Sequence, residues 1–126
     1  MKKFINFTNH HSSGWNRKQR EAALMYGEIV DIPFPDISPE LTDEELYSLA
    51  QNYTALLLSE EADCVLCQGE SVFSVLMVSM LIKNHVPVAA AVSRRTVMES
   101  TNENGQTIKR SVFEFKGFRK YILDHP

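Results

Sequence analysis

Three short segments of the chain gather the side chains that could do chemistry. The first offers an amide, two imidazoles and three hydroxyls, from Thr8, Asn9, His10, His11, Ser12 and Ser13. The second is Gln68, Gly69, Glu70 and Ser71, and the third is Ser93, Arg94 and Arg95. A histidine titrates near neutral pH and can pass a proton, and the planar fork of arginine suits phosphate. These residue types predict a pocket for a phosphorylated ligand, with acid–base chemistry on it.

Within this pocket, His10 is the candidate for proton transfer because it comes nearer the end of the first predicted strand than His11 does. Arg94 is the candidate for stabilising negative charge during a reaction. The other residues of the three segments are candidate ligand-binding residues, and so is Arg119 near the end of the chain.

Most of these residues also have a structural interpretation, and the sequence leaves that choice open. Serines often cap helices, which applies to Ser12, Ser13 and Ser71. Glu70 could complement a helix N-terminus, and the two adjacent arginines could be solvated charges at a strand edge. Trp15 could offer a stacking platform for a base or anchor the core.

The elements that position these segments are predicted strands and helices, which alternate along the chain. Apolar runs predict strands over residues 3–8, 28–33, 64–68 and 86–92. Helices are expected between them: one after an N-cap at Asn16, one after the capping box of Thr42 and Glu45, and one over residues 72–84. Residues 95–101 and 107–121 alternate in polarity and are joined through Asn104-Gly105, which predicts a hairpin.

This order predicts one α/β domain over residues 1–126, with a mostly parallel sheet in β-α-β-α-β-α-β order followed by a C-terminal β-hairpin. In such sheets, ligands bind outside the carboxyl ends of the strands, where the strand order reverses. The three polar segments directly follow three of the predicted parallel strands. We therefore expect them to line one pocket.

Composition and charge argue against several classes of protein. The chain has 13 basic and 16 acidic residues and a net charge of -3, which does not suit a basic surface for duplex nucleic acid. The longest apolar run, residues 72–82, is too short to span a bilayer as a helix. The amino terminus lacks the apolar stretch of a signal peptide. We expect a cytoplasmic protein with neither a membrane nor a duplex partner.

Cys64 and Cys67 form a C-x-x-C pair, which is typical of redox or zinc sites. The pair lies inside a predicted buried strand, where residues three apart face opposite sides of the sheet. Zinc would need two more ligands, and the sequence has no second matching pair. We expect two reduced structural cysteines, and neither a metal nor a cofactor.

Several familiar catalytic motifs are missing from the sequence. It contains no P-loop and no G-x-G-x-x-G after the first strand. Phe73 stands where a nucleophile elbow would have its second glycine after Ser71. NTPases, dinucleotide oxidoreductases and α/β-hydrolases are therefore disfavoured.

The first strand runs into Asn9-His10 and is followed by serines, Trp15 and Gln19. This arrangement resembles the small stand-alone CRISPR-associated proteins of the ring nuclease kind. The rest of the layout is compatible, with Cys67-Gln68-Gly69-Glu70 after the third strand, Ser93-Arg94 after the fourth and residues 115–121 at the end. The similarity covers most of the chain in layout and is specific at Asn9-His10.

The resemblance implies a Rossmann-like, three-layer domain related to the larger CRISPR-associated (CARF) sensor domains. It implies binding of a cyclic oligoadenylate second messenger, such as cyclic tetra-adenylate, in type III CRISPR antiviral signalling. It further implies metal-independent cleavage, in which a ribose 2′-hydroxyl attacks the adjacent phosphorus while cationic groups stabilise the charge. The products would be linear fragments with 2′,3′-cyclic phosphate ends. Only Asn9 and His10 take a role from the resemblance.

Two other functions are open on the sequence. The protein could be a non-catalytic nucleotide sensor with the same pocket. It could also be a small nucleotide or nucleoside hydrolase or transferase that uses Glu70 as its acid or nucleophile.

The helix predicted over residues 72–84 is apolar on nearly every side, so that one face can pack on the sheet while the other needs cover. A second copy of the chain or the terminal hairpin could supply this cover. A cyclic oligonucleotide has a rotational symmetry that a two-fold protein axis can match. We therefore expect a homodimer.

Overall fold

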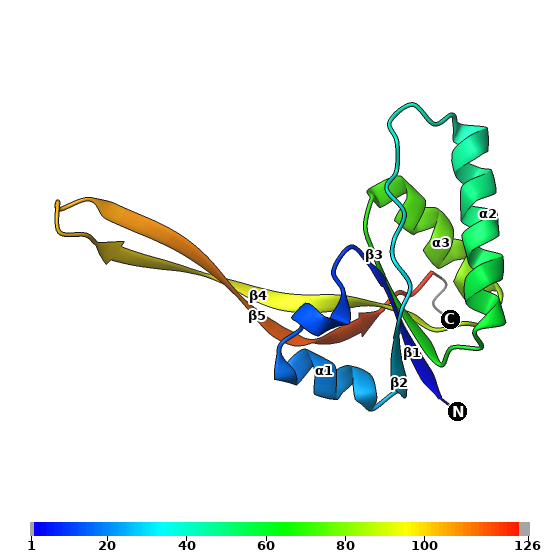
Figure 1. Cartoon of the computed structure of the whole chain (residues 1–126), viewed down its shortest axis with the longest axis horizontal. Helices are drawn as coiled ribbons and strands as arrows, with labels where there is room; N and C mark the ends of the chain where they lie inside the picture. The colour runs from blue at the N-terminus through cyan, green and yellow to red at the C-terminus, as the bar shows by residue number, and fades with distance from the viewer. Residues whose placement is uncertain (1, 124–126) are drawn as a thin grey trace.

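The computed structural model describes residues 2–123 and has a mixed α/β architecture (Figure 1). Its elements in chain order are β1 (Lys3–Thr8), the short 3-10 helix η1 (Ser12–Gly14), α1 (Arg17–Leu24), β2 (Glu28–Asp31), α2 (Asp43–Ser59), β3 (Cys64–Gln68), α3 (Ser71–Lys83), β4 (Val88–Thr101) and β5 (Thr107–Lys120). No helix in this part of the chain is long and apolar enough to cross a membrane.

The five strands form one sheet in the order β2-β1-β3-β4-β5. Strand β1 pairs in parallel with both β2 and β3, and β3 pairs in parallel with β4. Strand β5 is antiparallel to β4. The expected α/β class and mostly parallel sheet are therefore confirmed.

Helices cover both faces of this sheet. Phe4, Cys64 and Leu66 point to the side of α1, where they form a buried cluster with Ala23 of that helix. The alternate strand residues, such as Ile5 and Phe7, point to the other side, where they pack with Leu57 of α2, Phe73 of α3 and further apolar residues. Because side chains alternate between the two faces, each central strand contributes residues to both buried clusters.

The helix starts match the capping signals in the sequence. The Asn16 side chain accepts a hydrogen bond from the backbone N–H of Gln19 at 2.9 Å. Thr42 and Glu45 form a reciprocal capping box at the start of α2. Each cap satisfies backbone donors that the first helical turn leaves free.

The C-terminal strands differ from the expectation of a short fourth strand and a separate hairpin. Strand β4 is one continuous strand of 14 residues, and β5 pairs along its whole length. A register shift between Val92 and Ser93 is the only irregularity that separates the inner from the outer part. The prediction of a loop at Ser93, Arg94 and Arg95 is therefore wrong, and these residues continue β4. No glycine or proline interrupts the strand there.

The turn of this long hairpin is where the sequence placed it. Gly105 has a φ of +76°, a conformation that glycine adopts without steric cost. The Asn102 side-chain oxygen accepts hydrogen bonds from the backbone N–H groups of Asn104 and Gln106, each at 2.9 Å. Figure 1 shows the outer half of the hairpin extending well away from the other elements.

Cys64 and Cys67 are free, buried and on opposite sides of the sheet, as expected. Burial raises the pKa of the Cys64 thiol to about 11 and that of Cys67 to about 12. A thiol that stays protonated is a poor nucleophile and a poor metal ligand. Both side chains act as small apolar core residues.

Candidate functional site

A cavity of about 800 Å³ opens on the α1 side of the sheet, at the carboxyl ends of β1 and β3. The chain steps from β1 to β2 in one direction and from β3 to β4 in the other, so the strand order reverses between β1 and β3. This is the position at which open parallel sheets bind ligands. The lining residues are Thr8, Asn9, His10, His11, Ser13, Gly14, Trp15, Asn16, Gln19, Leu66, Gln68, Gly69, Ala91, Ser93, Phe113 and Phe115.

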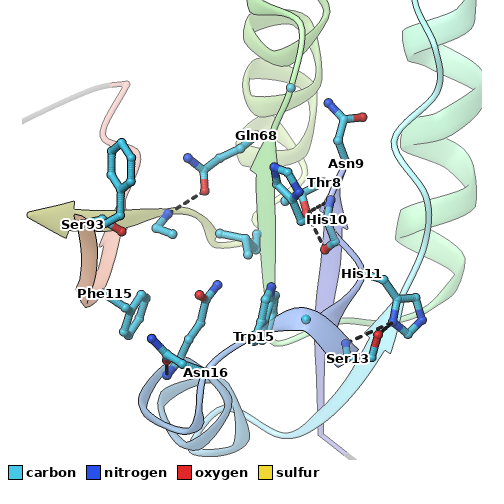
Figure 2. A pocket seen from close by; sticks show the side chains of 16 residues that line it. Thr8, Asn9, His10, His11, Ser13, Trp15, Asn16, Gln68, Ser93 and Phe115 are labelled. Atoms are coloured by element: carbon cyan, nitrogen blue, oxygen red, sulfur yellow. Dashed lines mark hydrogen bonds between the residues drawn. The ribbon is translucent and has the colours of Figure 1, made fainter. Parts of the chain in front are cut away.

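Aromatic rings and amides dominate the walls of this cavity (Figure 2). Trp15 packs edge-on against Phe4, with ring centroids 6.3 Å apart, and also lines the cavity. Trp15 therefore serves as a core anchor and as a wall of the cavity at once. Phe115 is buried and belongs to the opposite wall, which β5 supplies.

One of the amides, Gln68 at the end of β3, is held in a defined orientation. Its side-chain oxygen accepts a hydrogen bond from the backbone N–H of Ala91 on β4 at 2.8 Å (Figure 2). Because the oxygen is engaged, the NH₂ group is left as a donor for a ligand. The adjacent strand thus sets the orientation of a recognition group.

The segment that carries the two histidines is fixed by a carboxylate that the sequence analysis missed. Asp31, at the end of β2, accepts hydrogen bonds from the Ser12 backbone N–H at 2.9 Å and the Ser12 hydroxyl at 2.6 Å. It also accepts one from the amide of buried Asn6 at 2.7 Å. Asn6 in turn donates to the His10 backbone oxygen at 2.8 Å. The signal that could have revealed this network is a polar residue between two apolar neighbours in each predicted strand, Asn6 in the first and Asp31 in the second.

The network also sets the charge of Asp31. Partial burial alone would raise its pKa, but hydrogen bonds from Ser12 and Asn6, together with nearby His11, outweigh burial and lower the pKa. Asp31 is therefore an anion that orders the segment, and Ser12 is one of its donors. Ser12 is buried and does not line the cavity.

The two adjacent histidines have different surroundings. His11 is engaged, since its Nδ1 accepts a hydrogen bond from the Ser13 backbone N–H at 3.1 Å and its Nε2 lies 3.3 Å from an Asp31 oxygen. The His10 imidazole is exposed and lines the cavity, and no residue between 2 and 123 hydrogen-bonds it. Of the two rings, His10 is the one available to a ligand.

The start of α3 differs from the anion site that its position suggested. Glu70 is the N-cap of this helix, and its carboxylate accepts a hydrogen bond from the Phe73 backbone N–H at 2.8 Å. A negative charge thus already occupies the helix terminus next to Ser71. Glu70 lies with Asn9 on a second cavity of about 490 Å³, beside Phe34. Gly69 is required there because a Cβ at this position would overlap the Phe34 ring.

None of the three predicted arginines lines the main cavity. Side chains alternate along a strand, so Arg94 faces away from the side of Ser93, and Arg119, which pairs with Ala90, also faces away. Arg95 is on the same side as Ser93 but farther out, where its guanidinium donates to the Ser111 hydroxyl at 3.0 and 3.1 Å. The structure thus brings most of the predicted residues together at the main cavity, namely Thr8, Asn9, His10, His11, Ser13, Gln68, Gly69 and Ser93. The others, Ser12, Glu70, Ser71 and the three arginines, do not line it.

Comparison with known proteins gives the chain a family. Residues 2–119 match the Uncharacterized protein MJ1673 family. The chain belongs to this family. No curated protein matches the chain. Every residue that lines the main cavity lies within the part of this MJ1673-family chain that matches.

Some lining residues of this MJ1673-family protein carried no signal in the sequence. Phe113 and Phe115 are separated in sequence from the other lining residues and reach the cavity only because Ser93 pairs with Phe115 across the hairpin. Asn16 and Gln19 were read as helix capping residues, and they also line the cavity. Within residues 2–123, no group of three or more His, Cys, Asp or Glu side chains is arranged to hold a metal ion.

Proposed function

We propose that this MJ1673-family protein binds a cyclic oligoadenylate in the main cavity and cleaves it, with His10 as the proton-transfer group. The observation that carries the proposal is a cavity at the reversal of strand order, walled by Trp15 and Phe115 and lined by several amides. The parallel strand order with helices on both faces supports a Rossmann-like classification, the class in which nucleotides bind at this position.

The lining suits a purine base. Stacking of a base on an aromatic side chain contributes about 1–3 kcal/mol, and Trp15 presents such a ring to the cavity. Amides recognise adenine by pairing with its N6 and N7 atoms. Gln68 offers an oriented donor for this purpose, and Gln19 and Asn16 offer further amides nearby.

The proposed reaction needs one proton removed and one proton delivered. The ribose 2′-oxygen loses its proton and bonds to the adjacent phosphorus, while the bond from phosphorus to the 5′-oxygen breaks and that oxygen takes up a proton. His10 can serve either transfer because its imidazole lines the cavity and no residue between 2 and 123 hydrogen-bonds the ring. Arg95 is the arginine on the cavity side of β4 and is the better placed of the two to meet phosphate charge. Arg94 faces away from the cavity and takes no part in the proposed reaction.

The size of the cavity supports a shared site. A volume of about 800 Å³ is in the range that holds one drug-sized ligand, and a ring of four nucleotides is larger than that. A two-fold axis would present the same groups to opposite phosphates of the ring. The proposal therefore includes a homodimer in which two cavities face one ring.

A second candidate is a non-catalytic sensor of the same ligand. It is favoured by the lack of any lysine or arginine among the lining residues, because developing phosphate charge is usually met by cations. The use of Glu70 as an acid or nucleophile is disfavoured, since its carboxylate caps α3 and lies on a different cavity.

The test is to incubate the protein with cyclic tetra-adenylate in EDTA and to separate the products by chromatography and mass. We expect linear fragments with 2′,3′-cyclic phosphate ends, formed about 10²–10⁴-fold more slowly by the His10→Ala variant. Tight binding without turnover would leave the sensor as the function. Neither binding nor cleavage would refute both.

A further inference from the structure

The outer hairpin, which we call the arm, comprises β4 from Ser93 onward, the turn and β5 up to Phe115, residues 93–115 (Figure 1). From Ser93 with Phe115 to Thr101 with Thr107, its two strands pair only with each other. A two-stranded hairpin on its own is marginally stable in water. An arm of this length is therefore expected to be supported by another surface.

The face of the arm turned away from the cavity carries apolar side chains that the proposed site does not use. Met98 and Ile108 lie diagonally across the two strands on this face and are 57% and 46% exposed. Val112 is on the same face and is half-buried. This apolar stripe is flanked by Arg110 and by Arg94, which pairs across the strands with Glu114.

Charge separates the arm from the remainder of the chain. Residues 93–115 contain four basic and three acidic side chains, a net charge of +1. The remainder of the chain has nine basic and thirteen acidic side chains, a net charge of -4. Opposite charges on two parts of one sequence favour association of the arm of one copy with the body of another.

Two other uses of the arm fit the residues less well. Pairing of two β5 edges would bring together strands that each carry five basic and one acidic side chain, and like charges across strands are destabilising. Binding of the arm to a nucleic acid is disfavoured because two lysines of β5 already have acidic partners. Lys109 lies 3.7 Å from Glu99 and Lys116 lies 2.9 Å from Glu114.

The body offers a matching surface on α3. Val72 and Val75 face outward there, and Val75 is 68% exposed. Beside them is a mostly apolar groove of about 450 Å³ between α3 and the segment of Tyr121 and Leu123. The neighbouring helix α2 begins with three acidic residues, Asp43, Glu44 and Glu45, at the same edge of the sheet as the start of α3.

We infer that the arm is a self-association device that docks on the outer face of α3 in a second copy of the chain. The stripe of Met98, Ile108 and Val112 covers Val72 and Val75 of the other copy, while the basic flanks meet its acidic surface. The inference rests on the surface of the chain alone and holds whether or not the cavity takes a nucleotide.

The experiment measures the molar mass of the ligand-free full chain by light scattering and sedimentation across micromolar concentrations. One variant lacks residues 97–101 and 107–111, which shortens both strands equally and keeps the turn and Phe113. A second is Val75→Asp, and its matched control is Met25→Asp, which changes an 88% exposed residue after α1. Circular dichroism checks that each variant is folded.

We expect a dimer for the wild type and for Met25→Asp. In the other two variants we expect the dimer affinity to fall by about tenfold to a hundredfold or more. Raising the salt concentration should also weaken the dimer, because exposed charges are screened. A monomeric wild type would overturn the inference, and so would a dimer that survives either the shortened arm or Val75→Asp. A monomer whose arm binds single-stranded RNA would assign the basic surface to nucleic acid instead.

Discussion

His10 and His11 are neighbours in the chain, yet only one ring is free to act. Both residues line the cavity, but the His11 ring is held by Ser13 and Asp31, whereas no residue between 2 and 123 hydrogen-bonds the His10 ring. We predict that His10→Ala lowers turnover of the cyclic ligand about 10²–10⁴-fold, the usual contribution of a general acid or base, while binding largely survives.

Single-turnover cleavage and equilibrium binding, measured on the same protein, check this prediction. His11→Ala is the matched control and should lower turnover far less, because the His11 ring is already engaged with Ser13 and Asp31. Equal loss of binding and rate in His10→Ala would make this residue a ligand clamp. An unchanged rate would remove it from the mechanism.

Asp31 gives the segment a dependence on pH. Its pKa is lowered in the folded protein by the hydrogen bonds of Ser12 and Asn6, which outweigh its partial burial. A carboxyl group with a lowered folded pKa stabilises the protein above its unfolded pKa of about 3.9 and loses that contribution as the pH falls through the folded value.

We predict that Asp31→Asn lowers the free energy of unfolding by about 1.5 kcal/mol at neutral pH, the contribution of a hydrogen bond to a charged group. The difference from the wild type should shrink as the pH falls below about 4. Urea unfolding at several pH values measures it, with Asp36→Asn, at an exposed aspartate, as the control. A difference that stays constant with pH would contradict the assigned role.

The residues of the site were predicted in part. The polar residues that directly follow β1 and β3 could be assigned from sequence, because the carboxyl ends of parallel strands meet at one edge. Asn6 and Asp31 could not be assigned with the same argument, since their role depends on pairing between β1 and β2. The arginines were misplaced because a strand alternates its side chains where a loop would not.

At the scale of elements, the turn between β3 and α3 approaches the segment after β2 very closely. Gly69 allows this approach, because a side chain there would overlap the ring of Phe34. We predict that Gly69→Ala lowers the free energy of unfolding by about 1–3 kcal/mol, the usual cost of overpacking a buried site.

Gly14→Ala is the control for this prediction, since nothing lies within 4 Å of a Cβ at that position. Chemical unfolding of both variants gives the comparison. Equal stability of Gly69→Ala and Gly14→Ala would show that Phe34 moves aside without cost, and would refute the tight packing of these two segments.

Caps and turns were the elements most open to prediction. Asn16, the pair of Thr42 and Glu45, and Asn104-Gly105 act through local hydrogen bonds or backbone freedom, so a few adjacent residues suffice to specify them. The length of β4 was not predictable in this way. Its continuation past Val92 depends on antiparallel pairing with β5, whose register the sequence does not reveal.

At the scale of the whole molecule, the order of strands decides where the cavity lies. The sequence predicted alternating strands and helices, but it did not give the order β2-β1-β3-β4-β5 that puts β1 beside β3. That adjacency joins the segment of Asn9 and His10 to Gln68 and Gly69. The projecting arm then adds Phe113 and Phe115 as a wall that no local pattern revealed.

The central claim is that the cavity between these elements binds a nucleotide ring, and Trp15 can report on it. It is the single tryptophan of the chain and it lines the cavity. The most direct test is a titration of the protein with cyclic tetra-adenylate while tryptophan emission is recorded, for the wild type and for the slowly cleaving His10→Ala variant. We predict a saturable change in emission for both proteins, as expected when a ligand enters the cavity that Trp15 lines. Saturable binding by calorimetry without any change in Trp15 emission, or no binding at all, would contradict the account.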